Sequence, residues 1–460
     1  MSPGTPSPVP GRYRLLGADG AEVESADATF SVEPDALVVQ PRQQAVLRLD
    51  LADADGLELG DHLLRLVLGS GERVEASMLG RRHQELCDSL GASLGAYQAK
   101  NLLLEEPIGG EAFDCAVARD GAETAVQVRV WATSLSVSPK LGVPYGLPFG
   151  EISGVTFDEA RYAIDLLTAD GTVSLLRLGT RTQPCLRLIE SRLAELARRT
   201  AAAIAYLVPL PSLTSRRLTQ LLADGVPVSR ARMDTVAPTI WPALVEAAIP
   251  SRKLRQAFES LAALCPSSEI AVGIKETNGR QDQTDERELD KETEGSPPEV
   301  AAEEADGSAA AGDGPEEARA EEETPMTGRV VWFAFPIYGD DRARPGNALA
   351  VETVTRSGRA TYLFRIAPPD VYRDASADEL RRLASERITS VSRAMVALTF
   401  KREPIYLSDQ VIQTGPYARY RLALRLSVPL RSSRATFLGR ATHGPAWRRQ
   451  LDAALLRALG

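Results

Sequence analysis

The chain contains an internal repeat, because residues 27–100 and residues 126–200 share the order and spacing of their apolar positions. The matching residues at the start of the copies are Phe30 and Val32 in the first and Val128 and Val130 in the second. Self-similarity of this kind is the signature of a duplicated structural unit. Any fold for this chain must therefore contain the same unit twice.

Each copy has the pattern of several strands followed by one helix. Alternating apolar and polar residues lead to a turn at Gly71 in the first copy and at Gly171 in the second, which is typical of a β-hairpin. The entry to the next segment is Leu79-Gly80-Arg81-Arg82 in the first copy and Leu178-Gly179-Thr180-Arg181 in the second. Helical periodicity then predicts helices over residues 83–104 and 184–207.

The strand order, the Leu-Gly-x-Arg entry to the helix and the duplication together resemble the pleckstrin-homology-like (PH-like) superfold. This resemblance implies two tandem small β-barrels, each closed by a C-terminal helix. Their expected ranges are 12–106 and 107–208, after a disordered lead at 1–11. PH-like folds host lipid, peptide and protein ligands, so the fold alone does not choose among them.

The whole chain is also similar to a group of uncharacterised bacterial proteins in which two such units precede a third α+β module. That likeness is carried by Leu79-Gly80-Arg81-Arg82, Leu103-Leu104-Glu105-Glu106-Pro107, Arg344-Pro345-Gly346-Asn347-Ala348, Arg402-Glu403-Pro404-Ile405-Tyr406-Leu407 and Tyr417-Ala418-Arg419-Tyr420. The group has no assigned activity. Its likeness therefore implies an architecture and no function.

After the repeats, a helical connector is predicted at 209–266 and a C-terminal α+β domain at 267–460. An acidic stretch at 276–327 interrupts that domain; between residues 276 and 325 it has 18 acidic against 4 basic residues. Such a composition cannot repay the entropy of ordering, so we predict a disordered insertion. Strand patterns at 269–275 and 329–338 flank it, and we expect these two strands to be neighbours in one sheet.

The third domain is predicted to continue with strands at 348–354 and 360–366. A helix is expected at 378–397, because Ser376 and Glu379 have the spacing of a capping box. A final helix is expected at 446–459. Strands followed by helices favour the α+β class over an alternating α/β fold.

Composition excludes several kinds of site. The four cysteines form no C-x-x-C pair, and none of the three histidines has a second His or a Glu at zinc-ligand spacing, so no metal is expected. Phosphate-binding glycine loops, nucleophile elbows and zinc-protease motifs are also missing from the sequence, so no cofactor is expected. With neither a signal peptide nor an apolar run long enough to span a membrane, the expected location is the cytoplasm.

A loop rich in proline and glycine at 139–149 is the first candidate binding surface. It carries five apolar side chains, Leu141, Val143, Tyr145, Leu147 and Phe149. Apolar side chains on a stiffened loop can form a partner-binding surface. The alternative is that they fold back and cover the mouth of the second barrel.

The C-terminal part is basic, with 22 Lys and Arg against 11 Asp and Glu after residue 327. It could bind an anionic partner such as nucleic acid or an acidic membrane surface, and the candidate residues are Arg365, Arg402, Arg419, Arg421, Arg440 and His443. The alternative is a solvated face in an arginine-rich chain. Phosphoinositide binding by the first repeat is disfavoured, because Glu33 and Asp35 dominate the neighbourhood that would contact the headgroup.

These patterns favour a non-enzymatic adaptor or scaffold that binds protein or peptide partners through its two repeats. The alternative is a C-terminal domain that binds an anionic ligand or houses an enzyme site, with His443 as a candidate beside Thr442 and Asp409. A further hypothesis is that the acidic insertion masks the basic domain, since tethering gives it a high effective concentration. The sequence identifies neither the partner nor the oligomeric state.

Overall fold

The computed structural model describes residues 7–106, 108–119, 121–249, 252–276, 329–339, 342–354, 360–412 and 415–459. They form two compact units. The first unit contains residues 1–196 and 394–434, and the second contains residues 197–393 and 435–460. Residues 394–434 thus group with the repeats, whereas the sequence pattern predicts one C-terminal domain over 267–460.

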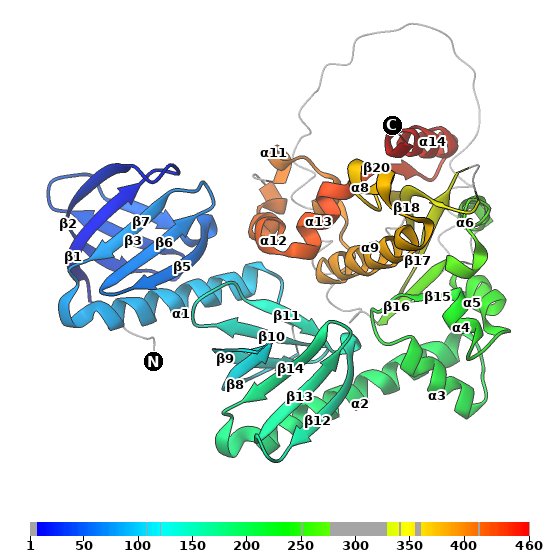
Figure 1. Cartoon of the computed structure of the whole chain (residues 1–460), viewed down its shortest axis with the longest axis horizontal. Coiled ribbons are helices and arrows are strands. Elements are labelled where there is room, and N and C mark those ends of the chain that lie inside the picture. The colour runs from blue at the N-terminus through cyan, green and yellow to red at the C-terminus, as the bar shows by residue number, and fades with distance from the viewer. Residues whose placement is uncertain are drawn as a thin grey trace, which may run out of the picture. The chain divides into compact units, whose positions relative to one another are not determined.

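The first repeat is a seven-stranded antiparallel sheet followed by a helix (Figure 1). Its elements are β1 Val9–Leu16, β2 Glu22–Val32, β3 Ala36–Pro41, β4 Leu47–Asp50, η1 Leu51–Asp53, β5 Ala54–Gly60, β6 Leu63–Leu68, β7 Arg73–Ser77, η2 Gly80–Arg82 and α1 His83–Asn101. The strand order is β4-β3-β2-β1-β7-β6-β5. The first strand begins inside the range that was predicted to be a disordered lead.

The second repeat has the same elements in the same order. They are β8 Gly109–Arg119, β9 Ala122–Trp131, β10 Ser134–Pro139, β11 Tyr145–Pro148, η3 Phe149–Glu151, β12 Ile152–Asp158, β13 Ala163–Thr168, β14 Gly171–Leu176, η4 Gly179–Arg181 and α2 Thr182–Leu207. Its strand order, β11-β10-β9-β8-β14-β13-β12, matches the first repeat position by position. The duplication is therefore real, and it is longer than the repeat ranges 27–100 and 126–200, because β1 and β8 precede them.

Each sheet has an apolar inner face against which its helix packs. In the first repeat, Phe30, Leu37 and Leu66 are buried together with Leu86 and Leu90 of α1. Residues four apart lie on one face of a helix, so α1 buries a single stripe. In the second repeat, Phe113 of the sheet and Ile189 of α2 are likewise buried in one cluster.

The two repeats also share unusual backbone conformations. Positive φ angles occur at His62 and Tyr162, with values of 57° and 52°. They occur again at Met78 and Arg177, with values of 56° and 59°. Side chains with a Cβ rarely adopt this region, so the same strained turn has been kept in both copies although the residue types differ.

The Leu-Gly-x-Arg entry to each helix has a direct structural reason. Arg82 Nη1 donates a hydrogen bond to the carbonyl of Pro8 at 2.8 Å, and Arg181 Nη1 donates to the carbonyl of Ala112 at 2.9 Å. Strand register makes these two carbonyls equivalent, each lying one residue before the buried Val9 or Phe113. The arginine therefore ties the start of the helix to the first strand of its own sheet.

The second unit is built on a six-stranded antiparallel sheet with order β15-β16-β17-β18-β19-β20. Its elements are α3 Ser212–Leu221, β15 Val228–Ser229, α4 Arg230–Asp234, α5 Ile240–Ala248, α6 Arg252–Ala262, η5 Ser267–Glu269, β16 Ala271–Glu276, β17 Arg329–Tyr338, β18 Pro345–Val354, β19 Ala360–Phe364, α8 Pro369–Asp374, α9 Ala377–Ala397, β20 Phe437–Thr442 and α14 Trp447–Leu459. The α+β class predicted from the sequence is confirmed.

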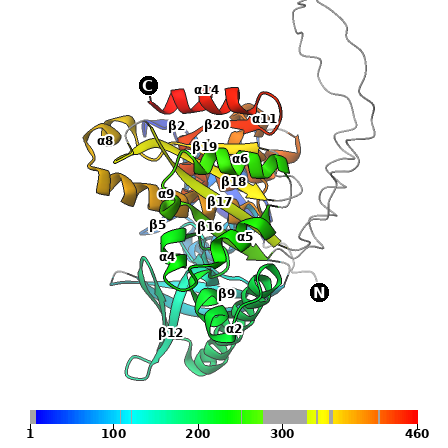
Figure 2. The same cartoon turned by 90° about the vertical axis from the view of Figure 1, so that its right-hand side faces the viewer.

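Helices cover both faces of this sheet, and Figure 2 lets the reader follow them along the strands. Phe333 of β17 lies among Trp241 of α5 and Phe258 of α6, with ring centroids 6.0 and 5.0 Å away. On the opposite face, Trp332 donates a 3.0 Å hydrogen bond to Ser392 of α9. Successive strand residues alternate between faces, so the strongly apolar β17 is buried on both sides.

The prediction that the strands on either side of the acidic stretch are neighbours is confirmed. β16 pairs antiparallel with β17 over six residue pairs, from Ala271 with Ala334 to Glu276 with Arg329. The acidic stretch itself, 276–327, lies outside the described residues except for Glu276. The predicted cap of α9 is also present, since the hydroxyl of Ser376 accepts a 3.2 Å hydrogen bond from the backbone N–H of Glu379.

The remaining helices belong to the first unit. They are α10 Glu403–Tyr406, α11 Asp409–Ile412, η6 Gly415–Tyr420, α12 Arg421–Leu426 and α13 Val428–Thr436, the last of which runs past the end of this unit at residue 434. Leu438-Gly439-Arg440 resembles the Leu-Gly-x-Arg entry in sequence, but it does not repeat the helix entry of the two repeats. These three residues lie within strand β20.

Candidate functional site

The five apolar residues of segment 139–149 divide into two groups. Leu141 and Val143 are exposed, with 42% and 36% of their surface accessible. Tyr145 and Leu147 lie on β11 and pack partly against the core of the second repeat, and burial raises the pKa of Tyr145. Phe149 is a core residue, 1% exposed. The outward apolar surface of this segment is therefore smaller than the sequence suggested.

The six residues predicted to bind an anion do not gather in one place. Arg402, Arg419 and Arg421 belong to the first unit, whereas Arg365, Arg440 and His443 belong to the second. Arg402 is buried, and Arg365 donates a 3.0 Å hydrogen bond to the carbonyl of Arg457. Arg440 is exposed on β20. Only Arg419 and Arg421 lie beside each other, at the end of η6 and the start of α12.

Arg421 and Arg425 of α12 meet an acidic corner of the first repeat, which we define as residues 52–55. The guanidinium of Arg421 pairs with Asp53 at 2.5 Å, and that of Arg425 pairs with Asp55 at 2.7 Å. The side chains at positions i and i+4 of a helix share one face, so one turn of α12 presents both cations together. The corner thus holds a helix through two arginines.

Arg425 is bound by backbone carbonyl groups as well as by the carboxylate of Asp55. Arg425 Nη2 donates hydrogen bonds to the carbonyls of Ala52 and Ala54, at 2.9 and 3.3 Å. The 3-10 turn η1 turns these carbonyls outward, where a planar guanidinium can reach two acceptors. Gly69 leaves the necessary room, since a Cβ at this position would lie 2.8 Å from the Arg425 guanidinium.

A hollow of about 310 Å³ lies next to this contact. It is lined by Ala52, Tyr97, Asn101, Ala418, Arg419, Arg421 and Leu422. Burial raises the pKa of Tyr97, and the Arg419 guanidinium lies 4.9 Å from the ring centre of Tyr420. The hollow is therefore an incompletely filled edge of the contact between α12 and the first repeat.

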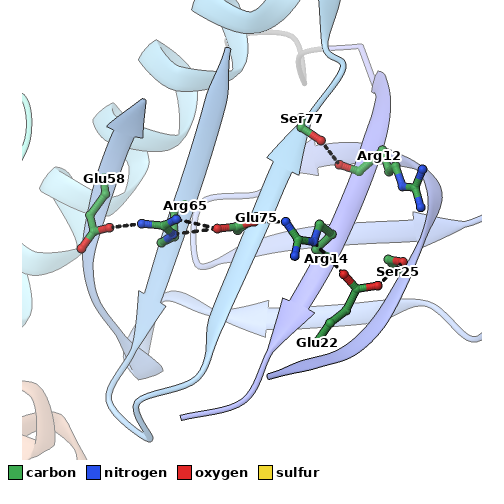
Figure 3. Close-up of polar contacts among 8 residues, drawn as sticks. All are labelled: Arg12, Arg14, Glu22, Ser25, Glu58, Arg65, Glu75 and Ser77. Carbon is green, nitrogen blue, oxygen red and sulfur yellow. Dashed lines mark hydrogen bonds and ion pairs between the residues drawn. The ribbon is translucent and has the colours of Figure 1, made fainter. Parts of the chain in front are cut away.

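The outer face of the first sheet carries a row of alternating charges, which we call the charge ladder (Figure 3). It consists of Glu22, Arg14, Glu75, Arg65 and Glu58, one on each of β2, β1, β7, β6 and β5. Glu75 is 4% exposed and pairs with Arg14 at 3.3 Å and with Arg65 at 2.6 Å. Each arginine then pairs with an outer glutamate, at 2.9 Å for Glu22 and 2.8 Å for Glu58.

The ladder is internally satisfied, so its two arginines are poor candidates for binding an external anion. The pKa of Arg65 is raised by its hydrogen bonds with Glu58 and Glu75, and the pKa of Glu22 is lowered by its hydrogen bonds with Ser25 and Arg14. Opposite charges directly across adjacent strands fix strand register. We assign this row a structural role.

His443 belongs to a buried polar network and not to the Thr442 and Asp409 group considered from the sequence. Its Nε2 lies 3.1 Å from a carboxylate oxygen of Glu352, whose other oxygen accepts a 2.8 Å hydrogen bond from Thr361. Trp447 donates to the same threonine hydroxyl at 2.9 Å. Glu352 and Thr361 are at most 1% exposed, so a substrate has no access to them, and the network fastens β20 and α14 onto β18 and β19.

The cysteine side chains have the properties of buried structural thiols. All four are free and buried. Burial raises the pKa of Cys115 and of Cys185 to about 12 and also raises the pKa of Cys87 and Cys265, so thiolates are scarce at neutral pH. Across the described ranges, no group of three or more His, Cys, Asp or Glu side chains could hold a metal ion. Among the same residues, no helix has the length and apolarity to cross a membrane.

Comparisons with known proteins supply no function. No family model matches the chain, and no curated protein matches it. One similar solved structure is described as the "Crystal structure of the C-terminal domain of an unknown protein from Leishmania infantum". It is 19% identical, the match covers 21% of this chain and 92% of that one, and the TM-score is 0.19, too low to support an argument.

Sequence reasoning identified one side of the α12 contact, because Arg421 is among the candidate anion-binding residues. It did not connect that arginine with Asp53, which lies 368 positions away. Glu352 was missed altogether. The available signal was the single charged residue in the stretch 348–354, since a buried carboxylate in a strand needs a partner.

Proposed function

We propose that the chain is a non-enzymatic adaptor whose two repeats are PH-like domains that bind segments of protein partners. The PH-like assignment is supported by the strand order 4-3-2-1-7-6-5 in each sheet and by the single helix that follows the seventh strand. Small β domains with a C-terminal helix commonly bind peptides at strand edges and corners. Function on such a fold has to be argued from a site, and the acidic corner supplies one.

The contact of α12 with the acidic corner is the observation that carries the proposal. A helix separated from the corner by more than 360 positions along the chain is held by two ion pairs and two backbone carbonyls. It contacts the corner in the same way that a partner's helix would. The first repeat therefore recognises an arginine-bearing helix, and in this chain its own α12 occupies the position.

The alternative, an anionic ligand on the basic C-terminal part, is less well supported. Arg421 and Arg425 pair with acids of the chain itself, and Arg434 pairs with Asp409. Arg365 is engaged with a backbone carbonyl. Arginines that already have partners must break these contacts before they can bind phosphate groups.

A binding assay in trans tests the proposal on the full chain. The variant carrying Arg421→Ala and Arg425→Ala frees the corner, and a labelled synthetic peptide of residues 415–436 is then added. We expect the peptide to bind this variant and to bind wild-type protein much more weakly, because the wild-type corner is occupied. Adding Asp53→Asn and Asp55→Asn to the variant serves as the matched control and should abolish the binding. Equal binding to all three proteins, or none to any, would contradict the proposal.

A further inference from the structure

The second repeat has an open hollow on the outer face of its sheet. The hollow measures about 350 Å³ and is lined by Asp114, Cys115, Ala116, Glu123, Ala125 and Arg177. Its floor includes the cross-strand pair Ala116 and Ala125 of β8 and β9. Two small side chains opposite each other leave the space above the sheet unfilled.

Strand register shows what the first repeat places at these positions. Ala116 faces Leu176 on β14, and the equivalent residue Arg12 faces Ser77 on β7. Ala118 is equivalent to Arg14 in the same way, because Ala118 faces Ser174 and Arg14 faces Glu75. The first repeat therefore carries arginines at two alternate positions of its first strand, where the second repeat carries alanines.

The rim of the hollow favours a cation. Asp114 and Glu123 supply two carboxylates, against one guanidinium from Arg177. Arg177 pairs with Glu123 at 2.6 Å but remains 75% exposed, and Asp114 accepts a 3.2 Å hydrogen bond from Gln127. A carboxylate has about four lone-pair sites, so both acids can accept further charge-assisted hydrogen bonds from an incoming guanidinium.

We propose that this hollow binds arginine side chains of a protein partner, presented at alternate positions of an extended segment. The proposal rests on the adaptor function above and names the chemistry that the second repeat recognises. Three observations support it: the missing side chains of β8, the size of the hollow and the excess of negative charge on its rim. Of the two alanines, Ala116 lines the hollow, so one arginine of a partner would take the place that Arg12 has in the first repeat, and the next would lie beside Ala118.

The test uses the full chain and a short fluorescent peptide of glycine and serine with arginines at two alternate positions. We expect saturable binding that weakens as ionic strength rises. Ala116→Arg should fill the hollow in cis and weaken binding by about tenfold. The isosteric double variant Asp114→Asn with Glu123→Gln should have a similar effect without changing the volume of the site. Arg12→Ala in the first repeat is the matched control and should leave this binding intact.

Several results would overturn the proposal. They are unchanged affinity in both hollow variants, equal affinity for a peptide with citrulline in place of arginine, preference for a glutamate peptide, or no binding to wild-type protein. The two assays fail independently. If the 415–436 peptide binds the freed acidic corner but the arginine peptide does not bind the hollow, the adaptor proposal stands and only the hollow is excluded as a binding site.

Discussion

The two repeats share a backbone and differ in what they place on the outer face of the sheet. Along one row, the first repeat has Arg14, Glu75, Arg65 and Glu58 on neighbouring strands. The same row of the second repeat is Ala118, Ser174, Asp165 and Thr156. In the first repeat a row of ion pairs spans the strands, whereas the same row of the second repeat contains almost no charge. Both repeats keep the apolar residues of the inner face, so the fold depends on these. The residues of the outer row differ between the repeats, so the fold does not depend on them.

The corners differ in a similar way. The acidic corner of the first repeat, with Asp53 and Asp55, holds α12. The equivalent positions in the second repeat are Glu151 and Ser153, and Ser153 donates its hydroxyl to the carbonyl of Leu167. The duplication has given two different outer surfaces on one backbone, and each difference can be tested by exchanging residues.

The largest expected effect comes from Glu75. Replacing it by glutamine leaves Arg14 and Arg65 beside a neutral group that is almost fully buried. We expect the first repeat to lose about 2–3 kcal/mol of unfolding free energy. The matched change Ser174→Ala should cost the second repeat less than about 1 kcal/mol. Native-state hydrogen exchange of β6, β7, β13 and β14 reads the two repeats separately, and equal losses would show that the ladder does not stabilise the first sheet.

Arg425 should have the next largest effect. Arg425→Ala removes an ion pair and two hydrogen bonds to carbonyls, and we expect local opening of α12 to become easier by about 1–2 kcal/mol. Exchange of amides 418–426 should accelerate by about tenfold or more. Arg431→Ala, at an exposed position of α13, is the control and should change little. Gly69→Ala should weaken the same contact to a smaller degree, because its Cβ displaces only the flexible end of Arg425.

A substitution in the second repeat should lower its stability by a smaller amount, and two further substitutions should restore that stability. Ser174→Glu copies Glu75 into a row where Asp165 stands in place of Arg65, so two carboxylates meet on adjacent strands. We expect a loss of about 1 kcal/mol. Adding Asp165→Arg and Ala118→Arg completes a ladder and should restore the stability. If the triple variant is no more stable than the single one, cross-strand charge does not account for the difference between the repeats.

The smallest expected effect is on thiol chemistry. The ordinary thiol pKa of 9.0 is raised to about 12 for Cys115 and Cys185 in the second repeat. The two thiols stay protonated to a higher pH in the folded state than in the unfolded state. Their contribution to the free energy of unfolding is therefore fully present below pH 9 and is lost as the pH rises towards 12. Alkylation of native protein near neutral pH should be slow at both sites and faster at Cys87, whose Sγ lies 3.7 Å from His83 Nε2. Faster labelling of Cys115 than of Cys87 would contradict this order.

Sequence reasoning succeeded where the pattern is local or repeats at fixed spacing. It gave the two repeats, their closing helices, the capped start of α9 and the pairing of β16 with β17. The predicted domain ranges 12–106 and 107–208 include most of β1 and all of β8. The repeat ranges 27–100 and 126–200 leave both strands out, because the turn of the first hairpin is shorter in the second repeat and shifts any alignment between the two copies. Phe149 was read as part of a loop, although the 3-10 turn η3 directs its side chain into the core.

The site could not be predicted in the same way. The contact of Arg421 with Asp53 joins residues 368 positions apart, and no periodicity links two such charges. The hollow of the second repeat arises from residues that are small, and alanine at 116 and 125 carries no signal by itself. Strand register makes these two positions equivalent to Arg12 and Asp27 of the first repeat, and the sequence alone does not contain that register.

The pairing of Glu276 with Arg329 predicts how the protein behaves when its polypeptide chain is cleaved between these residues. A single cut anywhere between these two residues would give two fragments, and each compact unit contains chain from both of them. The strand pairs of β16 with β17, the helices packed on that sheet and the grip of α12 on the acidic corner would still join the pieces. The molecule is therefore a natural candidate for a split protein, with halves that can be produced separately and reassembled.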